Sequence, residues 1–307
     1  MLPPRIASVL ALTFVATRGD AQPDTLKQIV PGVWFRQGDI DHKGHCNNVI
    51  IEMADHLIVV DANFPSGARL VLEDAKRVSS KPVKFVFDTH HHGDHLYGNP
   101  VWTSMGAVTV AYAGVAEEIK RYEPKRWKQA AGEREDVREL KRDAPEAPMK
   151  TFTQSPYVME DSTRRVELHF FGWAHTRGDG FAWLPNEKVL ATGDAVTNGA
   201  YNYTADANVG NWPRVLAQAA KLQPRYVLPG HGAAGGKELI EGQSRFFVEL
   251  RKAVEQAARS GKKPDEIAAS IRLSDAVKNW VGSGLKAQVA DAYREVTLNK
   301  PAGDVQH

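Results

Sequence analysis

The 307-residue sequence contains one cysteine, Cys46, and has no marked excess of either charge. A single cysteine excludes an intramolecular disulfide and a zinc cluster built from several cysteines, so we interpret Cys46 as a small core residue. Lysine and arginine number 39 against 37 aspartate and glutamate, which gives a formal net charge of +2. A charge this small does not favour nucleic acid or an anionic membrane surface as a partner.

Long apolar runs are also scarce, and the one near the N-terminus is too short to cross a bilayer as a helix. It spans residues 6–16, follows Arg5 and precedes a small-residue segment at 19–21. A basic residue, an apolar stretch and then small residues are typical of a secretory signal peptide. We therefore predict a signal peptide over residues 1–21 and an exported protein, either periplasmic or secreted. The alternative is the frayed apolar N-terminus of a cytosolic protein.

The rest of the chain alternates between strand-like and helix-like patterns. Short apolar runs predict strands in the first part at residues 33–36, 48–53, 56–61, 83–88 and 108–111. They predict strands in the second part at residues 165–171, 180–185, 188–192 and 226–228. Apolar residues at helical spacing predict helices at residues 67–78 and 212–222. Strands that alternate with helices in this way indicate an α/β, layered architecture.

Two helical segments stand apart from this pattern. Residues 113–148 alternate in charge and predict a charged helical insertion with breaks near Pro124 and Gly132. We interpret it as a solvated face, and the alternative is a lid from which Tyr122 or Trp127 touches substrate. Residues 236–307 carry apolar stripes at helical spacing and predict a C-terminal helical extension packed on the main domain, residues 22–235.

The densest group of reactive side chains lies in residues 90–95, which hold four histidines and one aspartate. The segment follows the predicted strand at 83–88, so its side chains are expected at the edge of a sheet. Imidazole and carboxylate ligands suit Zn²⁺, with Fe or Mn as alternatives. The sequence therefore predicts a metal site here, against the alternative of a polar loop with solvated histidines.

Four motifs, each after a predicted strand, carry a resemblance to a known family. They are His90-x-His92-x-Asp94-His95, Ala174-His175-Thr176, Thr192-Gly193-Asp194 and Pro229-Gly230-His231-Gly232. Over about residues 28–235 the sequence resembles the metallo-β-lactamase superfamily. The resemblance implies a four-layer αββα sandwich with two metal ions, expected to be Zn²⁺, at one edge.

The resemblance also implies how the ligands are divided. Metal 1 would take His90, His92 and His175, metal 2 would take Asp94, His95 and His231, and Asp194 would bridge the two. His91 would point the opposite way in an extended segment and act as a packing residue or as a partner behind the ligands.

Three imidazoles on Zn²⁺ leave an open position for water and can lower its pKa to about 7. A second ion can hold the same hydroxide and stabilise developing negative charge. Asp94 can accept the proton of the attacking water and pass it to the leaving group. The expected function is that of an exported dinuclear zinc hydrolase, in which a metal-bound hydroxide attacks an acyl carbon of an ester, thioester, lactone or β-lactam.

One position departs from the β-lactamase pattern. Zinc β-lactamases with a cysteine ligand carry Gly-Gly-Cys where this sequence has Thr192-Gly193-Asp194. An aspartate at this position resembles instead the motif of glyoxalase II and of the wider hydrolases of the superfamily. This weakens the β-lactamase interpretation and leaves acyl hydrolysis in place. The alternatives are an iron- or sulfur-handling oxidoreductase of the same fold, a phosphoesterase, and a binding protein that has lost activity.

Residues that contact substrate are expected in the loop after Asp194. Residues 197–208 are polar and aromatic and begin close to that ligand, so they should rim the pocket. Tyr201, Tyr203 and Asn208 are the candidates for contact with a small-molecule substrate. The alternative is a solvated loop without such a role.

Overall fold

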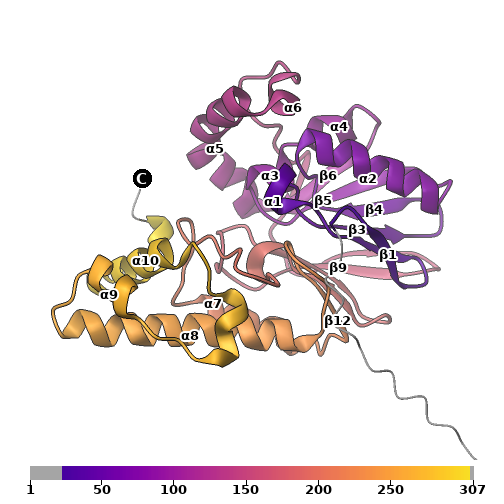
Figure 1. Ribbon diagram of the computed structural model, residues 1–307. Helices are drawn as coiled ribbons and strands as arrows, with labels where there is room; N and C mark the ends of the chain where they lie inside the picture. The colour runs from indigo at the N-terminus through magenta and orange to yellow at the C-terminus, as the bar shows by residue number, and fades with distance from the viewer. Residues whose placement is uncertain (1–22, 305–307) are drawn as a thin grey trace, which may run out of the picture.

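The computed structural model describes residues 23–304, in which two β-sheets pack face to face (Figure 1). The predicted signal peptide, residues 1–21, lies outside the described residues. The first sheet has the strand order β1-β2-β3-β4-β5-β6-β7. Its strands are β1 (Leu26–Val30), β2 (Val33–Arg36), β3 (Asn48–Glu52), β4 (Leu57–Val60), β5 (Val83–Asp88), β6 (Val108–Tyr112) and β7 (Lys150–Phe152).

The second sheet has the order β12-β11-β10-β9-β8. Its strands are β8 (Tyr157–Glu160), β9 (Arg165–Phe170), β10 (Gly180–Leu184), β11 (Val189–Ala191) and β12 (Tyr226–Leu228). Strands β4 to β7 pair in parallel, as do β11 and β12, and every other pair is antiparallel. Parallel neighbours need crossover connections, and in this chain each of those connections contains at least one helix.

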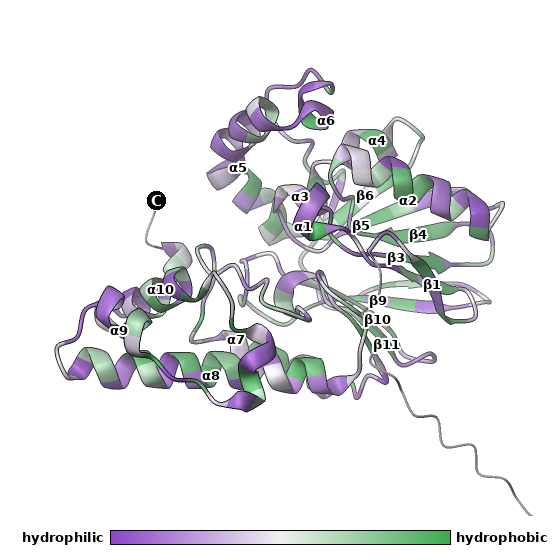
Figure 2. Cartoon of the chain, in the orientation of Figure 1, coloured by the Kyte–Doolittle hydropathy of each residue, from purple (hydrophilic) through white to green (hydrophobic). Residues whose placement is uncertain are grey.

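Apolar side chains of both sheets fill the layer between them. Ile51 and Phe87 of the first sheet belong to the same buried cluster as Leu168 and Leu184 of the second. The next residue along a strand points to the other face, so Ile50 packs under the helices α2 (Pro65–Val78) and α4 (Asn99–Thr103). Because both faces of the central strands are buried, these strands are nearly continuous apolar runs (Figure 2).

Helices α7 (Trp212–Ala220) and α8 (Lys237–Arg259) cover the outer face of the second sheet, opposite α2 and α4 (Figure 1). Trp212 and Phe247 stack there with ring centroids 4.0 Å apart, beside the buried Trp183. The chain continues through α9 (Pro264–Ser270), η2 (Asp275–Trp280), α10 (Leu285–Leu298) and η3 (Ala302–Asp304). The four layers are helix, sheet, sheet and helix, so the predicted αββα sandwich is confirmed.

The segment predicted as a charged insertion holds α5 (Ala113–Glu133) and α6 (Glu135–Arg138), and α5 is mostly hydrophilic (Figure 2). The predicted break near Pro124 is wrong, because α5 continues through that proline. Proline removes one backbone donor from a helix, but buried side chains on both sides of it, Ile119 and Trp127, anchor α5 on the same apolar cluster. Packing therefore outweighs the loss of one hydrogen bond.

Strands β1, β7 and β8 are missing from the prediction, and all three lie at sheet edges. Their residues are largely exposed or half-buried, so they lack the apolar run that marks a buried strand. No helix within residues 23–304 combines the length and the apolar character that a membrane span requires.

Candidate metal centre

The seven predicted metal ligands gather at one edge of the sandwich. The first sheet supplies four of them, His90 and His92 in the turn after β5, and Asp94 and His95 in the short helix α3 (Gly93–Leu96). The second sheet supplies His175 after β9, Asp194 in the 3-10 helix η1 (Gly193–Ala195) after β11, and His231 after β12. Segments far apart in the sequence thus meet because the two sheets pack face to face and the strands that carry the ligands end at the same edge of the sandwich.

His90, His92 and His175, called here the first trio, direct one ring nitrogen each toward a common point. Nδ1 of His92 lies 2.9 Å from Nε2 of His175 and 3.2 Å from Nε2 of His90. Burial lowers the pKa of His92 to about 3 and that of His175 to about 4, and it also lowers the pKa of His90. The three imidazoles are therefore neutral, which is the form that binds a metal ion.

The rings of His90 and His175 are held from behind. Nδ1 of His90 lies 3.0 Å from Oγ1 of Thr89, and Nδ1 of His175 lies 3.0 Å from the backbone carbonyl of Tyr203. A partner on the far nitrogen fixes both the orientation of the ring and the nitrogen that keeps the proton. Both rings are thus set with Nε2 toward the common point.

Asp94, His95 and His231 form a second trio. Oδ2 of Asp94 lies 3.3 Å from Nε2 of His95 and 3.2 Å from Nε2 of His231. On the far side of its ring, Nδ1 of His95 is 2.9 Å from Oδ2 of the buried Asp61. Burial opposes a charge on His231, but Asp194 and Asp94 beside it raise its pKa to about 9. This trio offers one carboxylate and two imidazoles.

The side chain of Asp194 lies between the two trios. Oδ2 is 3.2 Å from Nε2 of His231 and 3.8 Å from Nε2 of His175, and Oδ1 is 3.3 Å from Nε2 of His95. The position of the Asp194 side chain depends on Gly230. A Cβ atom on residue 230 would lie only 2.0 Å from Oδ1 of Asp194. The glycine is therefore required for the close approach of the two segments.

The donor atoms of both trios fit divalent metal ions. In each trio the three ligand atoms lie within 4.8 Å of one another. Oδ1 of Asp194 is buried and has no hydrogen-bond partner within residues 23–304. A buried acceptor of this kind needs a partner, and a cation held by the trios would supply it. Imidazole with carboxylate is a ligand set that suits Zn²⁺.

The sequence prediction missed three residues that support the ligands. Asp61 and Asp206 each contact the far ring nitrogen of a histidine ligand, and Arg126 contacts Asp206. Asp206 is fully buried, and its Oδ2 lies 2.8 Å from Nε2 of His92. Arg126, on α5, donates to both oxygens of Asp206 at 2.7 and 2.9 Å. A polar loop next to a ligand was the only sequence signal for Asp206, and nothing in the sequence indicated which helix would reach it.

His91 faces the pair of Arg126 and Asp206 and not the two trios. Its Nε2 lies 3.2 Å from Nη1 of Arg126 and 3.4 Å from Oδ2 of Asp206. Its ring stacks on Tyr122, with centroids 5.7 Å apart. This placement agrees with the predicted role of His91 as a partner behind the ligands.

A cavity of about 570 Å³ opens beside the trios and is in the size range of ligand sites. Residues of both trios line it, and so does one face of α5 with Arg126, Gln129, Ala130 and Glu133. Apolar side chains of Ile40, in the short helix α1 (Ile40–Lys43), and of Phe64 complete its rim. The alternative in which Tyr122 or Trp127 of a lid touches substrate finds no support, since neither residue lines the cavity.

Two of the three predicted substrate residues line the cavity. The ring centroid of Tyr201 lies 5.8 Å from that of His231, and the ring of Tyr203 lies 5.4 Å from that of His92. Asn208 is placed elsewhere, shortly before α7, where its Oδ1 accepts a hydrogen bond from the backbone N–H of Asn211, the residue directly before the helix. The cavity thus brings together the two tyrosines and leaves the asparagine outside.

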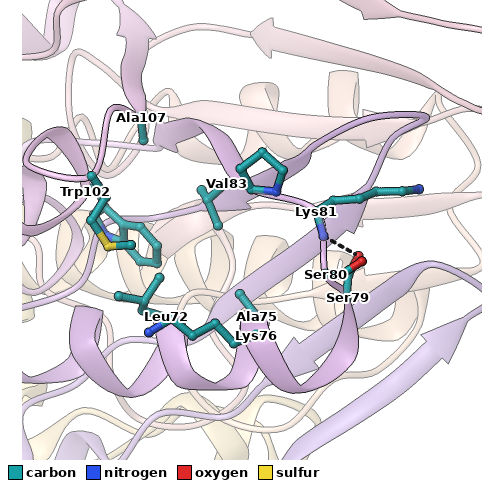
Figure 3. Close-up of a pocket in the computed structure, with 11 residues that line it drawn as sticks. Leu72, Ala75, Lys76, Ser79, Ser80, Lys81, Val83, Trp102 and Ala107 are labelled. Carbon is teal, nitrogen blue, oxygen red and sulfur yellow. Dashed lines mark hydrogen bonds between the residues drawn. The ribbon is translucent and has the colours of Figure 1, made fainter.

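A second hollow, of about 260 Å³, lies between α2 and the β5–β6 region (Figure 3). Leu72, Val83 and Trp102 contribute apolar side chains to its lining, which also includes Lys76 and Lys81. It contains neither a histidine nor a carboxylate. The chemistry therefore belongs to the larger cavity at the sandwich edge.

The αββα sandwich carries one trio of three histidines and one trio of an aspartate and two histidines at its edge, which places the chain in the class of αββα metalloproteins. The sequence matches the family profile of the metallo-beta-lactamase superfamily over residues 43–231. The chain belongs to this superfamily, which confirms the resemblance seen in its motifs.

Individual relatives are more distant. A metallo-beta-lactamase type 2 of Bacteroides fragilis is 34% identical over 99 residues, which cover 31% of this chain and 39% of that protein. The match therefore spans about two fifths of the length of that relative.

Solved structures that share the fold include the following two. A metallo-beta-lactamase from Pontibacter korlensis aligns with a TM-score of 0.59 at 21% sequence identity. The alignment covers 73% of this chain and 98% of the chain of that enzyme. The stereoselective inverting sec-alkylsulfatase Pisa1 from Pseudomonas sp. aligns with a TM-score of 0.71 at 16% sequence identity. The alignment covers 89% of this chain and 50% of the chain of the alkylsulfatase.

Proposed function

We propose that the protein is a dinuclear zinc hydrolase that acts on an acyl carbon of a small molecule, in an ester, thioester, lactone or β-lactam. The observation that carries the proposal is the position of Asp194 between two trios that both border one cavity. Two metal ions held there would leave a net positive site, which suits an anionic tetrahedral transition state.

Zn²⁺ bound by the trios would supply Lewis-acid catalysis, since it makes water acidic near neutral pH and stabilises developing negative charge. The chain's own residues would do the rest. Asp94 borders the cavity with a side chain that is 19% exposed, and we assign to its carboxylate the transfer of a proton from the attacking water to the leaving group. Tyr201 and Tyr203 offer aromatic faces and hydroxyl groups for binding the substrate.

A second candidate is the hydrolysis of alkyl sulfate esters. The alkylsulfatase covers 89% of this chain, against 73% for the Pontibacter korlensis enzyme, so its likeness extends over more of the chain. The same positive site would suit a sulfate ester. The alkylsulfatase is 16% identical in sequence to this chain. An alkyl sulfate is therefore included among the substrates of the activity assay.

The test is turnover by the zinc-loaded protein on a set of substrates. The set holds a chromogenic cephalosporin, an aryl ester, a thioester and a lactone, with an alkyl sulfate and a phosphodiester for comparison. We expect hydrolysis of at least one acyl substrate, and loss of two or more orders of magnitude in kcat/KM in Asp94→Ala. Failure on all acyl substrates, or near-normal turnover in Asp94→Ala, contradicts the proposal. Iron in the purified protein would favour the oxidoreductase alternative.

We further propose that the protein is exported. The support is the sequence of residues 1–21 alone, with Arg5, an apolar stretch and a small-residue segment in the order of a signal peptide. N-terminal sequencing of the protein from its native cells tests this. We expect a mature chain that begins at Gln22, and an intact Met1 in a cytosolic fraction would contradict export.

A further inference from the structure

His92 differs from the other two histidines of the first trio in the nitrogen that it presents. It turns Nδ1 toward the trio and Nε2 away from it, whereas His90 and His175 turn Nε2 toward the trio. Its orientation therefore depends on whatever holds Nε2. The acceptor there is Oδ2 of Asp206, at 2.8 Å.

Asp206 cannot hold this position without a cation. Its side chain is fully buried, and an unpaired buried carboxylate is costly. Arg126 supplies the cation, with Nη1 2.7 Å from Oδ2 and Nη2 2.9 Å from Oδ1. Two parallel N–H donors fix the plane of the carboxylate as well as its position. The direction in which Asp206 accepts from His92 is thus set by the arginine.

Arg126 is itself held in place by α5. Its guanidinium lies over the ring of Tyr122, 4.8 Å from the centroid, and Nη1 lies 3.2 Å from Nε2 of His91. The hydroxyl of Tyr122 donates to the backbone carbonyl of Gly303 at 2.7 Å. The helix is therefore tied to the C-terminal segment at the level of this arginine.

We propose that Arg126 is a positioning residue of the first metal site, which acts on the metal through Asp206 and His92. Helix α5 would then have two roles. It lines the cavity, and through Arg126 it would set the orientation of the His92 ring. The inference rests on the metal site of the proposed function. A substrate contact by Arg126, which also lines the cavity, is the competing role.

The test compares Arg126→Met with Arg134→Met. Arg134 is the residue directly after the C-terminal end of α5 and lines the same cavity, but it pairs with Asp136 and donates to the backbone of Lys43. Zn²⁺ affinity is measured by competition with a chromophoric chelator, and the visible spectrum is recorded after Co²⁺ substitution. We expect Arg126→Met to weaken one of two sites by about 10- to 100-fold and to change the Co²⁺ spectrum. Arg134→Met should leave both readouts as in the unmodified protein.

Arg126→Lys keeps the charge but loses the planar fork, and it serves if Arg126→Met does not fold. We expect a smaller loss of affinity and again a changed Co²⁺ spectrum. Unchanged affinity and spectrum in both Arg126 variants, or a change in KM alone, would overturn the inference. An equal loss in Arg134→Met would overturn it too, since loosening of α5 would then explain both. If the unmodified protein binds no metal, the proposed function fails first and independently.

Discussion

Oδ2 of Asp61 lies 2.9 Å from Nδ1 of His95, on the side of the ring that faces away from Asp94 and Asp194. The other oxygen of Asp61 accepts from the backbone N–H and the hydroxyl of Thr89, each at 2.8 Å. Asp61 thus links the two segments that carry the ligands of the first sheet. Its φ of +68° is in the left-handed region, which aspartate and asparagine tolerate better than most residues.

Asp61→Asn is expected to weaken metal binding by the second trio, Asp94, His95 and His231. Asparagine keeps the shape and the backbone conformation, but the amide nitrogen cannot accept the N–H of His95. We predict a loss of about 10- to 100-fold in affinity at one of two metal sites, measured by chelator competition. Unchanged affinity at both sites would show that the orientation of His95 does not depend on Asp61.

Tyr203→Phe is expected to affect substrate and not metal. The tyrosine side chain is 47% exposed at the cavity, and no hydrogen bond of its hydroxyl group is seen among the described residues. Removal of a hydroxyl that bonds substrate costs about 0.5–1.5 kcal/mol, so we predict a rise in KM of roughly 2- to 10-fold. Metal content measured by mass spectrometry serves as the control, and an equal loss of metal would contradict this role.

Asn208→Ala is the comparison for Tyr203→Phe. Its Oδ1 accepts the backbone N–H of Asn211 at 3.0 Å, outside the cavity. We predict a loss of stability of about 1 kcal/mol, seen in chemical denaturation, with KM unchanged. A selective rise in KM without loss of stability would restore the substrate contact that the sequence predicted.

Removal of metal is expected to destabilise the fold. A ligand present at about 1,000 times its dissociation constant stabilises a protein by about 4 kcal/mol. In a protein of this size each kcal/mol shifts the Tm by roughly 2–4 °C, so a chelator should lower it by on the order of 10 °C. Re-addition of Zn²⁺ should restore the Tm, which calorimetry would measure. A Tm that is unaffected by chelation would argue against occupied trios.

The sequence singled out the seven candidate ligands, which the structure brings together, because each motif is local. His90 and His92 follow one buried strand, and the strand period and motif spacing are readable without tertiary structure. The partners of the ligands are not local. Arg126 and Asp206 are separated by 80 positions in the chain, and their contact exists only once α5 packs against the loop after Asp194.

The same distinction explains the errors in the fold. Central strands such as β4 and β10 are buried on both faces and show in the sequence, whereas the edge strand β8 alternates between exposed and half-buried residues. The predicted break at Pro124 relied on a local rule that packing of Trp127 overrides. Asn208 was assigned to the pocket by its place in the loop, and only the structure shows that it turns to α7.

The central claim is that the two trios hold two metal ions, and metal content of the purified protein tests it most directly. Inductively coupled plasma mass spectrometry on the unmodified protein and on His175→Ala, which removes one nitrogen of the first trio, gives the count. The account predicts two Zn²⁺ per chain in the unmodified protein and about one in His175→Ala. Fewer than one metal ion per chain in the unmodified protein, or two that persist in His175→Ala, would contradict it.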